Sequence, residues 1–226
     1  MEKMEIWLEK HGVSAFWFKL LAIISMTIDH VGAVLFPNQI WMRVVGRFAF
    51  PIFCFFLVEG AYHTSNIRRY EGRLLAFALI SEVPFDLALF GQLGQWQHQN
   101  VFFTLFFGLV TMDIFLHCQN KIIRILVFIS SGLLCELLHT DYGIVGILFI
   151  VLFFAFHEDK RMAKGSVCLM NFAMYFRQIQ MYASLACILL LGYNGKRGPS
   201  MRLFFYVYYP LHLSVLAFLV KKGITF

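Results

Sequence analysis

Residues 20–36 read LLAIISMTIDHVGAVLF, an apolar run interrupted by Asp29 and His30 and long enough to form most of a membrane-spanning helix. A helix needs about 20 predominantly apolar residues, with a range of roughly 17–25, to cross the hydrocarbon core of a bilayer. Runs of similar character follow at residues 40–62, 74–90, 101–117, 122–138, 142–156, 165–193 and 203–220. The sequence therefore predicts an all-α fold, a polytopic transmembrane helix bundle.

The composition supports a membrane protein and excludes an ordinary soluble one. Hydrophobic residues make up 60% of the 226 residues and charged residues only 14%, whereas soluble domains carry about 25% charged residues. The mean hydropathy is +0.71. The chain has room for about eight or nine spanning helices, so we expect a single transmembrane domain over residues 1–226. The five cysteines lie scattered in apolar runs without CxxC spacing, and we expect neither a disulfide nor a metal site.

The number of helices depends on residues 165–193, which form either one tilted helix or two short helices that turn near Arg177. Lys and Arg favour cytoplasmic loops, and the two-helix arrangement places 14 of the 19 basic residues on one side. That side collects Lys3, Lys10, Lys19, Arg68, Arg69, Arg73, Lys121, Arg124, Lys160, Arg161, Lys164, Lys196, Arg197 and Arg202. A single helix would weaken this bias, so we predict nine helices, with eight as the alternative, and a cytoplasmic N-terminus.

Ionisable and amide groups accumulate at one depth of the predicted bundle. An ionisable side chain inside a bilayer costs about 2.5–3.5 kcal/mol on insertion scales, so it implies a partner, a cavity or a function. Asp29 and His30 lie about 10 Å below the end of the first helix, at 1.5 Å per residue. Arg43 and Arg47 lie one turn apart near the start of the second helix. The other groups expected near this level are Glu82, Asp86, Asn100, Thr104 and Asp141.

Two interpretations of these groups stay open. Arg43 and Arg47 could simply neutralise the carboxylates and hold the bundle together, or the groups could line a polar cavity that handles a substrate. His30 bears on the choice, because histidine has an unperturbed pKa near neutrality and can act as a general base. A lone histidine inside a membrane is also commonly a hydrogen-bonded structural residue. Asp29 need not touch His30, because adjacent residues point about 100° apart on a helix.

Three further features could belong to a substrate site or to the fold alone. His212 follows Pro210 in the last predicted helix, where a broken backbone ladder can open a polar pocket. Basic, glycine-bearing loops at residues 68–73 and 194–198 suit a phosphate-rich ligand, or reflect the ordinary preference of positive charge for the cytoplasm. Glu59, at the end of the second helix, is expected to pair with Arg68 or Arg73.

Several of these segments together resemble the TraX family. The resemblance rests on residues 25–32 (SMTIDHVG), residues 43–53 (RVVGRFAFPIF), Glu59-Gly60 and His63-Thr64. It continues in residues 84–86 (PFD), Asn100 with Thr104, residues 141–143 (DYG), 193–198 (YNGKRG) and 206–212 (YVYYPLH). The motifs occur in order over about residues 20–219, nearly the whole chain.

The resemblance implies an activity that composition and spacing do not show. TraX proteins are bacterial inner-membrane proteins known for acetylating the N-terminus of conjugative pilin, and the family is grouped with membrane acyltransferases that use acetyl-CoA or a similar donor. By resemblance, this chain is an acyl-CoA-dependent acetyltransferase of the bacterial inner membrane, with acetyl-CoA as co-substrate and no metal. Its expected partners are membrane lipid, the acyl-CoA donor and a pilin, peptide or small-molecule acceptor, with no nucleic acid.

Roles for individual residues follow as hypotheses from combining the resemblance with the buried charges. The donor would enter from the cytoplasm, with its phosphates held by Arg68, Arg69, Arg73, Lys196 and Arg197. His30, or alternatively His212, would act as the base, while Asp29 orients a base or balances the arginines. Contacts to the acceptor or the developing oxyanion are expected from Arg43, Arg47, Asn100, Thr104, Asp86 and Asp141.

Two other classes of function fit the same buried charges. A proton-coupled transporter or exporter would use them as a proton relay, with Pro84 and Pro210 as hinges. A non-catalytic membrane factor for pilus or peptide assembly would use them only for its fold. Binding of CoA distinguishes the acyltransferase from both alternatives.

Overall fold

The computed structural model of the chain describes residues 10–200 and 202–224, so the predicted basic residue Lys3 and the N-terminus itself lie outside the described residues. Over these residues the secondary structure is helical, with two isolated β-bridges and no strand. Three helical stretches (Ala15–Val34, Ile40–Tyr62 and Leu203–Lys221) are long and apolar enough to cross a membrane by themselves. The prediction of an all-α transmembrane bundle is confirmed.

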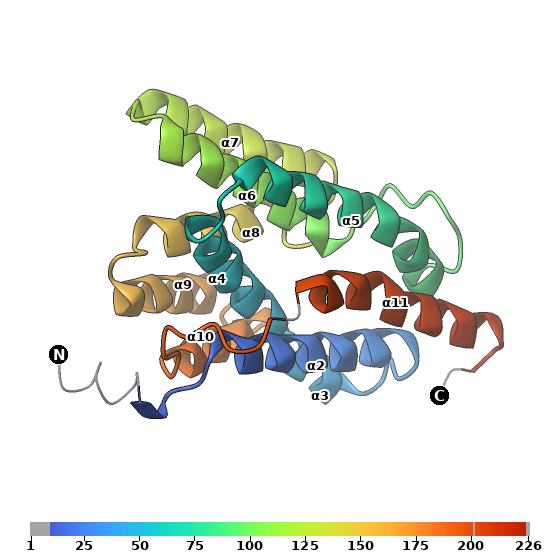
Figure 1. The fold of residues 1–226 in the computed structure, drawn as a ribbon. Coiled ribbons are helices and arrows are strands. Elements are labelled where there is room, and N and C mark those ends of the chain that lie inside the picture. The colour runs from blue at the N-terminus through green and yellow to red at the C-terminus, as the bar shows by residue number, and fades with distance from the viewer. Residues whose placement is uncertain (1–9, 201, 225–226) are drawn as a thin grey trace.

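The described helices form nine segments, as predicted, when closely consecutive helices are counted together (Figure 1). Two of the nine are composite, since α3 leads into α4 and the 3-10 helix η1 leads into α10. The elements are α2 (Ala15–Val34), α3 (Ile40–Gly46), α4 (Ala49–Tyr62), α5 (Ile67–Leu89), α6 (Val101–His117), α7 (Lys121–Leu137), α8 (Gly143–Ala155), α9 (Lys160–Met174), η1 (Ile179–Tyr182), α10 (Ala183–Leu190) and α11 (Arg202–Lys221).

Polar residues at the N-caps fix where several of these helices begin. The side chains of Asn66, Asn100, Asn120 and Asp159 each accept a backbone N–H from the first turn of α5, α6, α7 and α9, respectively. The first N–H groups of a helix have no partner within the helix, and leaving them unsatisfied in an apolar environment is costly. Short polar caps between long apolar runs therefore divide the sequence into hairpins.

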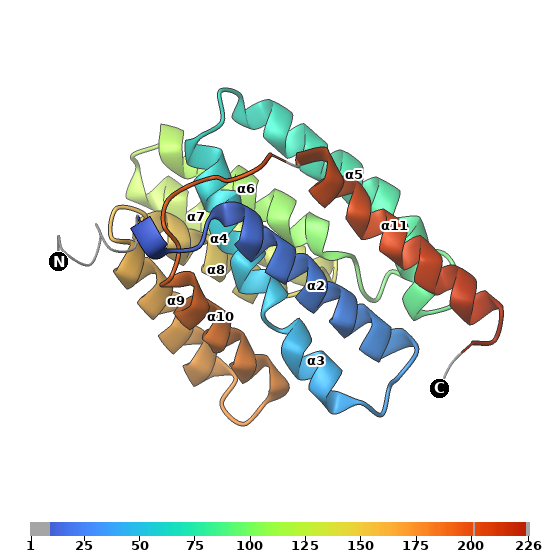
Figure 2. The same cartoon turned by 60° about the horizontal axis from the view of Figure 1, so that its bottom comes forward.

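The centre of the bundle is α4, most of whose residues are buried. Helices α2, α6, α8 and α10 pack around α4, and its Phe50 stacks on Tyr142 with ring centroids 3.6 Å apart. At one edge α11 lies alongside α5 and also contacts α2, as both ribbon views show (Figures 1 and 2). Helix α7 packs mainly on α6 and α8 and presents apolar side chains outward, as expected for a helix that faces lipid.

Residues 165–193 contain two helical segments rather than one. Helix α9 ends at Met174, and η1 begins at Ile179. Between them Arg177 has φ of 67°, the left-handed conformation that reverses a chain and is uncommon for a residue with a side chain. The predicted turn near Arg177 is confirmed.

The hairpins sort the loops into two ends of the bundle. We call the end formed by loops 63–66, 118–120, 156–159 and 191–201 the basic end, and the end formed by loops 35–39, 90–100, 138–142 and 175–178 the far end. Among the described residues the far end holds Arg43, Arg47, Arg177, Lys221 and Lys222, and the remaining basic positions lie toward the basic end. The predicted segregation of charge is therefore present.

Candidate functional site

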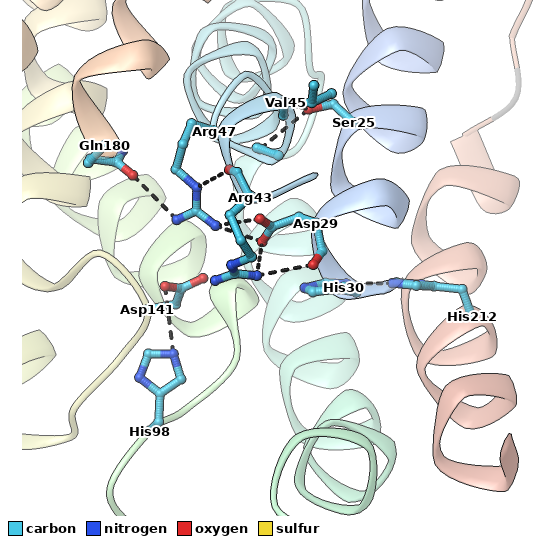
Figure 3. A network of polar contacts seen from close by, with 11 residues as sticks. Ser25, Asp29, His30, Arg43, Val45, Arg47, His98, Asp141, Gln180 and His212 are labelled. Atoms are coloured by element: carbon cyan, nitrogen blue, oxygen red, sulfur yellow. Dashed lines mark hydrogen bonds and ion pairs between the residues drawn. The ribbon is translucent and has the colours of Figure 1, made fainter. Parts of the chain in front are cut away.

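A carboxylate on α2 and two arginines from the next segment meet near the far end (Figure 3). The carboxylate of Asp29 receives two hydrogen bonds from Nη2 of Arg47, at 2.6 and 2.7 Å. Nη1 of Arg43 lies 2.9 Å from Oδ2 of Asp29 and also donates to the Asp29 backbone carbonyl at 3.1 Å. Charge-assisted contacts of this kind fix the relative position of their partners, so the two arginines neutralise Asp29, which both interpretations of these groups allow.

Close packing of α3 on α2 brings these charges together. Oγ of Ser25 donates to the carbonyl of Val45 at 2.6 Å. Gly46 faces Asp29 so closely that an added Cβ would overlap the carboxylate. A larger residue at position 46 would therefore push α3 away and break the ion pairs.

The second element of the site is a pair of histidines from the first and last described spans. Nδ1 of His30 on α2 lies 2.7 Å from Nε2 of His212 on α11. The other ring nitrogen of His212, Nδ1, lies 2.9 Å from the backbone carbonyl of Tyr208, which can only accept a hydrogen bond. In neutral His212 the proton therefore sits on Nδ1, and Nε2 accepts from Nδ1–H of His30. Nε2 of His30 then keeps its lone pair, which is what a general base requires.

Tyrosines from α11 surround the histidine pair. The hydroxyl of Tyr208 lies 2.9 Å from Oγ1 of Thr27, and the ring of Tyr209 meets His30 edge-on at 5.8 Å between centroids. The carboxylate of Asp29 contacts the two arginines. Within the described residues this carboxylate makes no hydrogen bond to the ring of His30. Asp29 and His30 thus belong to two adjacent groups, as the 100° helical rotation predicts.

Asp141 lies beside the arginines in the short turn between α7 and α8 (Figure 3). Its carboxylate is 3.7 Å from Nε2 of His98, and its backbone carbonyl accepts a hydrogen bond from Thr104. On the other side, Arg47 donates to Oε1 of Gln180 at 3.4 Å. Groups from α2, α3, η1, α11 and two far-end loops therefore gather around Asp29.

Two of the predicted substrate residues make contacts that organise the fold. The Asn100 side chain caps α6 and donates to the Ala78 carbonyl at 2.8 Å and to Glu82. Asp86 accepts the backbone N–H groups of Gly94 and Gln95 at 2.7 and 3.1 Å and so anchors the loop before α6. Direct contact of these residues with substrate stays a prediction.

At the basic end the buried carboxylate of Glu59 has partners other than the predicted ones. Its oxygens lie 3.0 Å from Nε2 of His157 and 3.5 Å from Nζ of Lys160. Arg68 instead pairs with Glu71 and with Asp113 on α6, at 3.3 and 3.2 Å. The expected pairing of Glu59 with Arg68 or Arg73 is wrong, because the loop after α8 reaches the end of α4 and supplies closer partners.

The predicted donor-binding residues lie in two loops of the basic end. Arg69, Lys196 and Arg197 are exposed, and Arg197 donates to Ser200 at 3.0 Å. Arg68 is held in its ion pairs, and Arg73 lies over the ring of Tyr70 at 5.4 Å. The loop at residues 194–198 is fixed to the start of α2 by hydrogen bonds from the N–H groups of Ala15 and Phe16.

No motif in the sequence indicates a cluster of lysines and aromatic rings that lies next to this loop. Nζ of Lys19 lies 5.1 Å from the ring centroid of Phe56, that of Lys164 lies 5.2 Å from Phe55, and that of Lys160 lies 5.5 Å from Tyr193. The three rings pack edge to face with centroids 5.1–5.5 Å apart. We call this set the lysine–aromatic cluster. Its members are far apart in the sequence, so no motif reveals them.

Two cavities lie near the two ends of the bundle. One of about 560 Å³ at the basic end is lined by Tyr62, Phe115, Arg124, Phe154, His157 and neighbouring residues. The other, about 550 Å³, is an apolar cavity between the far-end parts of α5 and α11, with Lys221 in its wall. Over residues 10–200 and 202–224, no three His, Cys, Asp or Glu side chains are arranged to hold a metal ion.

Known proteins resemble this chain over nearly its whole length. A profile described as TraX protein matches residues 15–220. The chain is 29% identical over 237 residues to the probable fimbrial assembly protein FimC, serogroup H1, of Dichelobacter nodosus, covering 90% of this chain and 94% of that protein. It is 24% identical over 220 residues to Protein TraX of Escherichia coli, covering 89% and 85% of the two chains. No solved structure matches the chain significantly.

Proposed function

The chain belongs to the TraX protein family, and on that premise we propose that it is an integral membrane acyltransferase. In the proposed reaction an acyl group, most simply acetyl, moves from acyl-CoA to an amine or hydroxyl of an acceptor. The observation that carries the proposal is the His30–His212 pair, because its hydrogen bonds leave Nε2 of His30 unprotonated beside two arginines. Acyl transfer needs a base for the acceptor and positive charge for the oxyanion.

The proposed mechanism uses residues already in contact. Nε2 of His30 removes a proton from the acceptor as the acceptor nitrogen or oxygen attacks the thioester carbonyl. The guanidinium groups stabilise the tetrahedral oxyanion, and Arg43 is the better placed of the two, because its side chain keeps 35% exposure against 16% for Arg47. Collapse of the intermediate breaks the C–S bond, and His30 returns the proton to the CoA thiolate.

Within this mechanism His212 is a positioning residue and Asp29 a structural counter-ion. His212 holds the His30 ring in one tautomer, and Asp29 holds the arginines at the reacting level. Fixing such groups in advance avoids reorganisation during the reaction. Asn100, Asp86, Thr104 and Asp141 are then candidates for shaping the acceptor side of the site.

We propose that the protein lies in the bacterial inner membrane. Its basic end then faces the cytoplasm, because Lys and Arg favour cytoplasmic loops. His30 lies 15 residues into α2 from Ala15, or about 22 Å at 1.5 Å per residue. Acetyl-CoA would dock at the basic end, assisted by Arg68, Arg69, Arg73, Lys196 and Arg197, and extend its narrow pantetheine arm toward His30. The acceptor would arrive from the far end.

The names of the relatives suggest the class of acceptor. One relative is called a probable fimbrial assembly protein, and another is a Protein TraX. We propose a pilin or another envelope peptide as the acceptor. The test is mass spectrometry of envelope proteins from cells with and without the gene, where the proposal predicts an acetyl group, a mass difference of about 42 Da, missing from one protein in the deletion strain. Identical acetylation in both strains would contradict it.

A second candidate function is a membrane assembly factor without catalysis, which the name of the Dichelobacter nodosus relative favours. Such a factor would need the Asp29 ion pairs for its fold but would have no use for an acyl donor. Titration of the purified chain with CoA separates the two candidates, because only the acyltransferase is expected to bind it.

A further inference from the structure

The apolar cavity between the far-end parts of α5 and α11 is a groove on the outside of the bundle. Figure 2 shows α11 beside α5 at the edge of the molecule. The groove measures about 550 Å³, within the range of about 300–1,000 Å³ for small-molecule sites. Val83 of α5 and Phe218 of α11, which line it, are both exposed. In a membrane protein an exposed apolar wall meets lipid, so acyl chains can reach this groove.

Small side chains and a proline account for the space between the two helices. Ser214 and Ala217 of α11 and Gly91 after α5 all line the groove, and none of them is large enough to fill it. Pro84 also lies in the wall, inside α5, and a proline within a helix normally bends it. Neighbouring helices therefore leave a gap here that larger residues on straight helices would close.

The groove extends from the far end into the membrane by most of one leaflet. On α11 it runs from Lys221 back to Ser214, seven residues or about 10 Å at 1.5 Å per residue. On α5 it reaches back to Val83, six residues or about 9 Å from the end of that helix at Leu89. Each leaflet supplies about half of a hydrocarbon core of about 30 Å. The groove thus matches the upper part of an acyl chain whose headgroup lies at the far end.

Two lysines stand at the mouth of the groove. Lys221 lies in its wall, and Nζ of Lys222 lies 5.7 Å from the ring centroid of Phe218, another wall residue. Both lysines are exposed. A lysine near the end of a membrane helix extends its ammonium group to the level of the headgroups, where it attracts anionic lipids.

The acidic side chains of the neighbouring elements face away from these lysines. Helix α11 carries no acidic residue, and the far-end half of α5 carries Glu82 and Asp86. Glu82 accepts a hydrogen bond from Asn100, and Asp86 accepts the N–H groups of Gly94 and Gln95. The other oxygen of each carboxylate is buried. Each of these two residues precedes a groove-lining residue by one position and so points about 100° away from the groove.

The rest of the acidic groups at the far end have partners of their own. Asp29 on α2 pairs with its two arginines, and Asp141 lies beside His98. The two described segments that flank the groove outside the helices, residues 90–100 and 222–224, contain no acidic residue. The described side chains around the mouth of the groove are therefore apolar, neutral or basic.

We propose that this groove binds one anionic phospholipid, with an acyl chain between α5 and α11 and the phosphate group at Lys221 and Lys222. A zwitterionic lipid would bring its own ammonium group beside two lysines and bind less tightly. A second copy of the chain fits less well, because a two-fold axis along the membrane normal brings the same surface of both copies together and would gather four lysines. The bound lipid joins α5 to α11, the helix that carries His212.

The experiment measures the binding of the first lipid to the full purified chain by native mass spectrometry in detergent. The probes are phosphatidylglycerol and phosphatidylcholine with identical acyl chains. Replacing both lysines (Lys221→Gln with Lys222→Gln) should lower affinity for phosphatidylglycerol about 25-fold, or about fivefold for each lysine at the membrane surface. Affinity for phosphatidylcholine should stay within twofold. Ser214→Phe should fill the groove and abolish tight binding of both lipids. Phosphatidylglycerol should also raise the melting temperature of the unmodified chain, since a ligand of the folded state stabilises it.

Two control variants match these changes. Val215→Phe introduces the same ring at the next position, which is exposed and does not line the groove. Lys10→Gln with Lys121→Gln removes the same charge from exposed lysines of the basic end. Both controls should keep the affinity of the unmodified chain for phosphatidylglycerol.

Several results would overturn the inference. Phosphatidylglycerol affinity within twofold of the unmodified chain in the variant without Lys221 and Lys222 would remove these lysines from the site. An equal loss in the control without Lys10 and Lys121 would show general attraction to positive charge. Unchanged binding in Ser214→Phe would place the lipid elsewhere, and lipid-free dimers that Ser214→Phe separates would assign the groove to a second copy. If Ser214→Phe has no melting transition, the lysine variants decide the matter alone.

The outcome does not depend on acyl transfer. His30→Gln leaves the groove intact and should bind phosphatidylglycerol like the unmodified chain. Lipid binding that depends on Lys221 and Lys222 in a protein that transfers no acyl group would uphold the lipid site and reject the acyltransferase. Acyl transfer by a chain without a lysine-dependent lipid would do the reverse.

Discussion

Each end of the bundle holds a buried carboxylate beside basic side chains, but the basic side chains differ in kind. At the far end the carboxylate of Asp29 forms ion pairs with Arg47 and Arg43 at 2.6–2.9 Å. At the basic end Glu59 has looser neighbours, His157 at 3.0 Å and Lys160 at 3.5 Å. Guanidinium groups form rigid, forked contacts, whereas an ammonium group is a mobile point charge on a flexible stem. The far end is therefore held in one geometry, whereas the contacts of Glu59 at the basic end allow more movement.

The largest expected effect concerns the side of the membrane on which each end of the bundle lies, because a position is labelled from outside either fully or not at all. The structure predicts that positions 68 and 160 lie at one end and position 95 at the other, and we place the first pair in the cytoplasm. On a background without native cysteines, Gln95→Cys should react with a membrane-impermeant thiol reagent in intact cells. Arg68→Cys and Lys160→Cys should react only after the cells are opened. Labelling of position 68 from outside would invert the proposed directions of donor and acceptor.

Removing the proposed base should give the largest effect on rate. We expect His30→Gln to lower turnover by roughly 10²–10⁴-fold, the usual contribution of general acid–base catalysis. Because the basic end is untouched, CoA affinity should stay the same. Acyl transfer must be measured at matched protein levels in the membrane. Near-normal turnover would remove His30 from the chemistry and transfer the role of base to His212.

The two carboxylates should differ in their contribution to stability. Asp29→Asn leaves two guanidinium groups without their counter-ion, and breaking a buried ion pair costs about 3–5 kcal/mol. Glu59→Gln should cost less, because its partner Lys160 has a side chain that is 43% exposed and can turn to water. Melting temperatures of both variants in the same detergent give the comparison. Equal losses would show that the far-end ion pairs are no more rigid than the contacts of Glu59.

The smallest effect is expected from the exposed basic loops. Replacing Arg69, Lys196 and Arg197 with Gln should weaken CoA binding only about two- to threefold in total, because exposed charges are screened by water and salt. The effect should vanish in high salt. Unchanged affinity at low salt would assign these loops to the ordinary preference of positive charge for the cytoplasm.

The sequence predicted the features that depend on hydrophobicity along the chain and on the regular rise of a helix. Long apolar runs identify the spans, and the balance of Lys and Arg identified the turn at Arg177. The meeting of Asp29 with Arg43 and Arg47 followed from their similar depth in consecutive helices. The contact of His30 with His212 was not predicted, because the two residues are 182 positions apart and the rotation of α11 against α2 depends on packing. The same reason hid the lysine–aromatic cluster and the partners of Glu59.

The shortness of the α9 to α10 hairpin has a consequence for the lipid around it. Helix α9 has 15 residues, and η1 with α10 has 4 and 8, which correspond to lengths of about 20–23 Å. The hydrocarbon core is about 30 Å thick, and a bilayer next to a shorter hydrophobic segment becomes thinner. We expect a depression of the outer leaflet beside this hairpin, with the exposed Arg177 at its floor. Gln180, which touches Arg47, lies at the same hairpin turn, so a water-borne acceptor would approach the Asp29 arginines through less lipid there than beside the longer helices α2 and α11.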